Sequence, residues 1–110
     1  MNKIFFFLSL LLIFVSSSDA AIYKGQKVFK KKCLECHTEE QKFVSSRTKS
    51  AWKNLINKDG EPLADAHIKD EKAKSSWDYF KDKKYKKDSK HLRQFLIEYA
   101  KDSGKVPACN

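Results

Sequence analysis

The chain is poor in residues that break or loosen secondary structure. Its 110 residues include only three glycines and two prolines. No glycine-rich or proline-rich stretch divides the sequence, which argues against a flexible linker and for one domain. No segment alternates apolar and polar residues as a half-buried strand does. We therefore expect an all-α fold.

Long apolar runs are restricted to the N-terminus. Lys3 precedes an apolar run over 4–15 that only Ser9 interrupts, and small or polar residues follow up to Ala20. This order is typical of a secretory signal peptide cleaved before Ala21, whereas a membrane-spanning helix requires about 20 apolar residues. We expect a signal peptide over 1–20 and one domain over 21–110, periplasmic or otherwise exported, with no membrane span after cleavage. An uncleaved membrane anchor is the alternative.

Negative charge is in the minority. The chain has 23 Lys and Arg against 14 Asp and Glu, a formal net charge of +9. Removal of 1–20 takes away one residue of each sign, Lys3 and Asp19, so the excess remains. A strongly basic surface attracts anionic partners, and an exported protein rarely meets nucleic acid. We expect partner proteins with acidic docking surfaces and no nucleic acid; a surface that only keeps the protein soluble is the alternative.

Helical spacing of apolar residues recurs along the rest of the chain. It predicts a first helix over about 22–36 that buries Ile22, Val28 and Phe29. A second helix is expected through 51–56, with Thr48 or Ser50 as its N-cap and a stop at 59–60.

Pro62 suits the first turn of a third helix, because its missing N–H costs nothing there. The spacing places six residues on one side of that helix: Leu63, Ala66, His67, Ala73, Trp77 and Phe80. The charge-rich segment 81–90 is expected to form an exposed turn with almost no core residue. Asp88 or Ser89 would then cap a last helix that buries Leu92, Phe95, Leu96 and Tyr99 and ends at Gly104.

The strongest chemical signal is the sequence Cys33-Leu34-Glu35-Cys36-His37. In a Cys-x-x-Cys-His motif, the two thiols can form thioethers with the vinyl groups of a haem, and the histidine then reaches the iron. We therefore expect one covalent haem c on Cys33 and Cys36, with His37 as the proximal iron ligand. Export fits this interpretation, because such haems are attached outside the cytoplasm.

Three competing interpretations of the motif are less favoured. A thioredoxin-like redox pair requires a βαβ pattern, which the sequence lacks. A zinc site could add Cys109, His67 or His91 to the motif, but the paired ligand spacings of known zinc sites are missing. A disulfide between Cys33 and Cys36 would close a very small loop and leave His37 unexplained.

The pattern Gly25-x-x-x-Phe29-x-x-x-Cys33-x-x-Cys36-His37 resembles the first helix and haem motif of class I cytochromes c. The resemblance implies a small helical fold in which the first helix crosses the last one closely. Gly25 and Phe29 would then contact Leu92 or Leu96 and Phe95 or Tyr99. It also implies electron transfer without any enzymatic reaction.

Two features depart from that family. No proline follows the motif closely, and the single methionine is Met1, which leaves with the signal peptide, so methionine ligation of the iron is excluded. His67 is then the candidate distal ligand, with a partly buried core histidine as the alternative interpretation of this residue, and His91 is the fallback ligand. A lysine from 81–87 could also ligate the iron, or the distal position could be open.

The expected function is electron transfer between larger redox proteins. The alternatives are a haem-based sensor or gas-binding protein with an open or displaceable distal site, and a haem subunit of a larger redox enzyme. Cys109 is an unpaired cysteine, which in an oxidising compartment suggests a disulfide-linked dimer or a free thiol. Four amphipathic aromatic residues are candidates for walls of the haem pocket, with core packing as the alternative: Trp52, Trp77, Tyr79 and Tyr85.

Overall fold

A computed structural model describes residues 17–107 of the chain, and every regular element in this part is helical, so the all-α prediction is confirmed. None of these helices is long and apolar enough to cross a membrane. Most of the expected signal peptide lies outside the described residues, and its last residues belong to the first helix. The elements in chain order are α1 (Ser17–Lys32), α2 (Glu40–Val44), α3 (Lys49–Leu55), α4 (Asn57–Ile68), the 3₁₀ helix η1 (Glu71–Ser76), α5 (Trp77–Lys81) and α6 (Lys83–Glu98).

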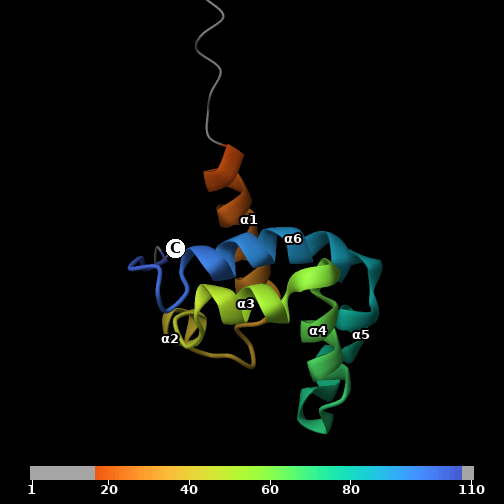
Figure 1. The fold of residues 1–110 in the computed structure, drawn as a ribbon. Coiled ribbons are helices and arrows are strands. Elements are labelled where there is room, and N and C mark those ends of the chain that lie inside the picture. The colour runs from red at the N-terminus through yellow and green to blue at the C-terminus, as the bar shows by residue number, and fades with distance from the viewer. Residues whose placement is uncertain (1–16, 108–110) are drawn as a thin grey trace, which may run out of the picture.

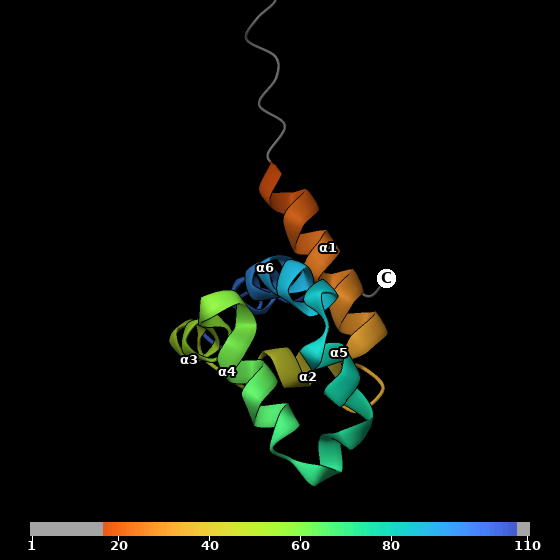
Figure 2. The same cartoon turned by 90° about the vertical axis from the view of Figure 1, so that its right-hand side faces the viewer.

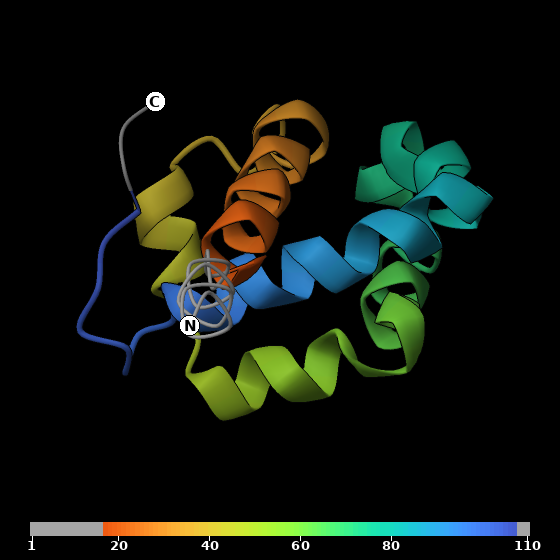
Figure 3. The ribbon, with the colours of Figure 1, turned by 90° about the horizontal axis from the view of Figure 1, so that it is seen from above.

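The crossing of α1 and α6 organises the fold. Figure 1 shows α1 running steeply across α6, and the view from above in Figure 3 agrees that the two helices touch where they cross. A Cβ atom at Gly25 would collide with the carbonyl group of His91 and lie 2.7 Å from the Cβ of Phe95. The rings of Phe29 and Phe95 pack 5.8 Å apart, centre to centre. The contact expected between the first and last helices is therefore confirmed.

The other helices close the core from below α6. Helix α3 lies under α6, while α4 and α5 stand side by side at one end of it (Figure 1). The Thr48 hydroxyl accepts a hydrogen bond from the N–H of Ala51, so the expected N-cap is confirmed for Thr48. Trp52 is buried and donates from its indole N–H to the carbonyl of Val44 at 2.8 Å, which joins α3 to α2.

A left-handed turn sets the direction of α4. Lys58, Asp59 and Gly60 have φ of 49°, 57° and 78°, so the regular part of α4 begins only after them, with Pro62 in its first turn as expected. Two non-glycine residues in this region cost roughly 1–2 kcal/mol each. The Tyr85 hydroxyl donates to the carbonyl of Gly60 at 2.6 Å, which holds the turn against α6.

Several expected boundaries are wrong. Helix α1 ends at Lys32, and the Cys-x-x-Cys-His motif follows it as hydrogen-bonded turns. The segment 81–90 is mostly helix: Asp82 caps α6 by accepting from the N–H of Lys84, and Tyr85 and Ser89 are buried. The expected caps Asp88 and Ser89 therefore lie inside α6, which ends at Glu98.

The third helix is also shorter than expected. It ends at Ile68, and η1 and α5 double back beside it. Ala66 is exposed, whereas Leu63, His67, Ala73 and Phe80 face the same interior space from different elements. Four of the six residues expected on one side of a single helix therefore do face one interior space. They come from several elements, because the chain folds back after Ile68.

Candidate functional site

Side chains of α1, α2, α3, α4, η1, α5 and α6 line an apolar cavity. Figure 2 shows how the labelled helices among these elements are arranged. Its volume is about 230 Å³, and it is partly open to solvent. The buried residues Leu92 and Leu96 of α6 line it, and so does Leu63 of α4. Such a mostly apolar hollow with a few polar groups is typical of a cofactor site.

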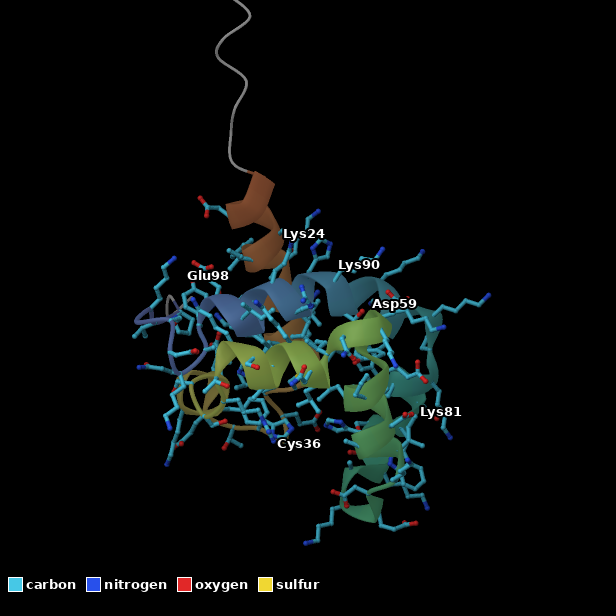
Figure 4. All side chains as sticks on the ribbon, in the orientation of Figure 1. Lys24, Cys36, Asp59, Lys81, Lys90 and Glu98 are labelled. Carbon is cyan, nitrogen blue, oxygen red and sulfur yellow. The ribbon has the colours of Figure 1, made fainter. Side chains whose placement is uncertain are left out.

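The Cys-x-x-Cys-His motif lies on the wall of this cavity. The N–H groups of Cys33 and His37 donate to the carbonyls of Phe29 and Cys33 at 2.8 and 2.9 Å, so the motif continues the chain as helical turns after α1. Cys33 is partly buried and Cys36 is exposed. Both thiols and the His37 side chain line the cavity, and Figure 4 shows Cys36 on the lower side of the molecule.

Burial changes the acid–base properties of the motif. It raises the pKa of the Cys33 thiol to about 12, with a smaller contribution from Cys36. Burial also lowers the pKa of His37, and the neighbouring His67 adds to this effect. The environment therefore favours the neutral imidazole of His37, which is the form that binds metals.

His67 lies in the same cavity, although 30 positions separate it from His37 in the sequence. The centres of the two imidazole rings are 6.1 Å apart. Two imidazoles on opposite sides of one metal ion have centres about 6 Å apart, because each metal–nitrogen bond is about 2 Å and each nitrogen lies about 1 Å from its ring centre. The observed separation suits a shared axial metal.

The chain holds His67 from several sides. Its Nδ1 is 2.8 Å from the carbonyl oxygen of Leu63, a contact that leaves Nε2 as the free ring nitrogen when Nδ1 carries the proton. The indole N–H of Trp77 donates to the backbone carbonyl of His67 at 2.6 Å. The ring of Phe80 stacks on the imidazole at 4.2 Å. His67 is therefore oriented by residues of both α4 and α5.

His91 is not part of the cavity lining. It lies at the crossing of α1 and α6, where its carbonyl group faces Gly25, and its buried Nδ1 has no hydrogen-bond partner among the described residues. The lysines of 81–87 do not line the cavity either. The described geometry thus brings His67, and neither His91 nor these lysines, to the cavity of His37.

One of the four aromatic candidates lines the cavity. This is Trp52, which is also buried in the core, whereas Tyr85 is buried and Trp77 and Tyr79 are partly buried outside the lining. The Tyr79 hydroxyl donates to Asp88 at 2.7 Å. Burial raises the pKa of Tyr79, and the hydrogen bond to Asp88 adds to the effect; burial also raises the pKa of Tyr85. Cys109 lies outside the described residues.

Two ring stacks and two cations of the site were not predicted from the sequence, although the expected third helix placed Phe80 on the same side as His67. Phe43 stacks on His37 at 4.1 Å, and Phe80 stacks on His67; neither pairing was predicted. Lys32 and Lys72 line the cavity as well. Phe43 follows His37 by only six residues, and this closeness in sequence could have indicated a contact. The stacking of Phe80 on His67 depends instead on the reversal of the chain after α4.

These residues suit a haem. The cavity offers two thiols in one turn, two imidazoles at the spacing of an axial pair and mostly apolar walls. Within 17–107, no group of three or more His, Cys, Asp or Glu side chains is arranged to hold a metal ion. A haem iron requires no such group, because the porphyrin supplies four of its ligands.

Comparisons with known proteins add no relative. No family model, no curated protein and no solved structure matches the chain.

Proposed function

We propose that the chain is an exported electron-transfer protein with one haem c, attached to Cys33 and Cys36 and ligated by His37 and His67. The observation that carries the proposal is the placement of two imidazoles 6.1 Å apart in one apolar cavity, beside the two thiols. When bound, haem iron supplies one-electron redox chemistry. The protein transforms no substrate and is not an enzyme.

The chain's own residues have three tasks in this function. Phe29, Leu92 and Leu96 keep the inner wall apolar and exclude water from it. The contacts of His67 with Leu63 and of its ring with Phe80 hold the imidazole in place. Lys32 and Lys72 supply positive charge in the lining, where it suits the carboxylates of a haem.

Replacement of His67 by alanine tests the ligand pair. The holoprotein should be low-spin in both oxidation states, and His67→Ala should make it high-spin and allow carbon monoxide to bind the reduced form. His91→Ala is the matched control, because His91 lies outside the cavity lining; it should leave the spectrum unchanged. A high-spin wild type, or a high-spin His91→Ala variant with an unchanged His67→Ala variant, would contradict the assignment.

Covalent attachment is tested separately. The haem should stay with the polypeptide after acid–acetone extraction, and Cys33→Ala or Cys36→Ala should reduce its incorporation in an exporting host. Complete release of haem from the wild type would refute the thioether assignment.

A gas-binding or sensor protein is the competing function. It requires an open or displaceable distal position, whereas the position of His67 favours an occupied one. Rapid, tight binding of carbon monoxide to the reduced wild type would favour the sensor. A stable partner that co-purifies with the protein would instead favour a subunit of a larger redox enzyme.

The proposed partners carry acidic docking surfaces. Residues 81–93 hold seven Lys and Arg and two Asp, a net charge of +5, so this segment carries much of the positive excess. Both acids are engaged within the protein, since Asp82 caps α6 and Asp88 accepts from Tyr79. We define the basic face as the exposed lysines of this segment, which are Lys81, Lys83, Lys84, Lys86, Lys87 and Lys90.

None of the six lysines of the basic face lines the cavity that Cys33, Cys36 and His37 line. Figure 4 shows Lys90 on the upper side of the molecule, Lys81 at its right edge and Cys36 on its lower side. Charge on the basic face would therefore steer an acidic partner through its long-range field, without any of these six lysines lining the cavity.

A further inference from the structure

The planes of the two histidine rings are crossed. The angle between the imidazoles of His37 and His67 is 84°. Because both rings line one cavity at the spacing of an axial pair, this angle is a property that a shared iron would report. The inference that follows rests on the proposed function, since it concerns the orientation of the two proposed ligands.

A phenylalanine covers one face of each ring. Phe43 stacks on His37 with 4.1 Å between centres and 29° between planes. Phe80 stacks on His67 with 4.2 Å between centres and 28° between planes. A stacked ring at this distance hinders rotation of the imidazole about the bond to its Cβ, because a turned ring would collide with the phenyl face.

Each phenylalanine is in turn fixed by the protein. Phe43 packs against Phe29 and Trp52 with ring centres 5.7 and 5.6 Å apart. Phe80 packs against Tyr85 at 4.8 Å, nearly edge to face. The two stacks belong to separate parts of the chain, one to α2 and one to α5, so each histidine plane is set independently.

We infer that Phe43 and Phe80 are positioning residues that hold the two axial imidazoles in nearly perpendicular planes. An imidazole interacts most strongly with the iron dπ orbital perpendicular to its own plane. Parallel rings therefore raise one of the two dπ orbitals and separate their energies, whereas crossed rings raise both and leave them almost equal. Residues behind the ligands tune a metal in this way without touching it.

Electron paramagnetic resonance (EPR) of the oxidised holoprotein reports the difference. Nearly equal dπ orbitals give a strongly anisotropic low-spin signal with one prominent feature at very low field. Well-separated orbitals give a rhombic signal with three resolved g values. We expect the first type for the wild type. A low-spin wild type with a rhombic signal would overturn the crossed geometry and leave the ligand pair intact, whereas a high-spin signal would overturn both.

Substitution of Phe80 tests its role. Phe80→Leu keeps an apolar side chain but removes the flat face, so the low-field feature should weaken and shift to higher field, with rhombic features in its place. Phe80→Tyr keeps the face and should retain the wild-type signal. Phe43→Leu should act on His37 as Phe80→Leu acts on His67.

The control is Phe95→Leu, which removes a buried ring that packs against Phe29 and Tyr99 and lies outside the cavity lining. It should leave the g values unchanged while the optical spectra of all variants remain low-spin. If Phe80→Leu and Phe43→Leu retain the wild-type signal, or if Phe95→Leu shifts it equally, the positioning role is wrong.

Discussion

The close crossing of α1 and α6 can be tested by adding one methyl group, in the variant Gly25→Ala. The new Cβ would collide with the backbone carbonyl of His91 and lie 2.6 Å from its carbon atom. Backbone atoms cannot rotate away as the end of a side chain can, so the two helices must separate. Overpacking of this kind costs typically about 1–3 kcal/mol, and we expect a value at the upper end.

Helix propensity acts in the opposite direction. Alanine favours an α-helix over glycine by about 1 kcal/mol, so the net loss of unfolding free energy should be about 2 kcal/mol. For a domain of this size, each 1 kcal/mol corresponds to roughly 4–8 °C, and the melting temperature should therefore fall by about 8–16 °C. Thermal and urea denaturation of the holoprotein measure both quantities.

Gly104→Ala is the control for this experiment. Gly104 has a φ of +70°, and a Cβ atom added there would meet no atom within 4 Å, so the only cost of alanine at this position is the strain of a left-handed backbone conformation. Its cost should be about 1–2 kcal/mol, without any displacement of helices. A Gly25→Ala variant as stable as the wild type would refute the crossing, since no arrangement of the present backbone admits the methyl group.

Three further predictions concern acid–base chemistry and charge. In the haem-free chain, iodoacetamide should label exposed Cys36 first, because burial raises the pKa of Cys33 to about 12 and keeps it a thiol at neutral pH; equal labelling of both in the folded state would contradict this. Burial raises the pKa values of Tyr79 and Tyr85 above 10.0, so the folded state retains protons that the unfolded state releases. Stability should be complete below about pH 10 and fall as the pH rises beyond it, and constant unfolding free energies up to about pH 12 would refute the burial argument. Finally, the double variant Lys84→Glu, Lys87→Glu should exchange electrons with an acidic partner more slowly than the wild type at low salt. The difference should shrink as salt rises past physiological strength, where the screening length is about 8 Å. Rates that change neither with the substitutions nor with salt would mean that these lysines only keep the protein soluble.

The core could be predicted where apolar spacing is regular. Phe29, Leu92 and Phe95 follow from helical periodicity, and their burial is confirmed. The start of α6 was missed because charged residues dominate it. Lysine is nonetheless a good helix former, and Tyr85, Ser89, Leu92 and Leu96 recur at intervals of four, three and four. Because Ser89 is polar, these four residues do not form a continuous apolar pattern in the sequence, although the structure buries all of them.

The candidate site could be predicted only in part. The residues of the Cys-x-x-Cys-His motif are close together in the sequence, so their spacing alone is enough to predict them as site residues. The approach of His67 to His37 depends on the left-handed turn that directs α4, and the approach of Phe80 depends on the reversal after Ile68. The hydrogen bonds of Trp77 to the carbonyls of His67 and Asp70 stabilise that reversal. Contacts of this kind carry no periodic signal, because they join side chains to backbone groups across a change of direction.

The position of His37 and His67 on one cavity has a consequence for chain entropy. A shared metal would close a loop of 30 residues, and a cross-link of that length removes enough freedom from the unfolded chain to stabilise the folded state by about 3.5 kcal/mol. A domain this small buries a limited apolar core and is only marginally stable. A contribution of this size is therefore a large part of its total unfolding free energy. The haem would then act on this chain as a disulfide acts on other small secreted proteins, and the arm formed by α4, η1 and α5 would reach its full rigidity only when His67 is ligated.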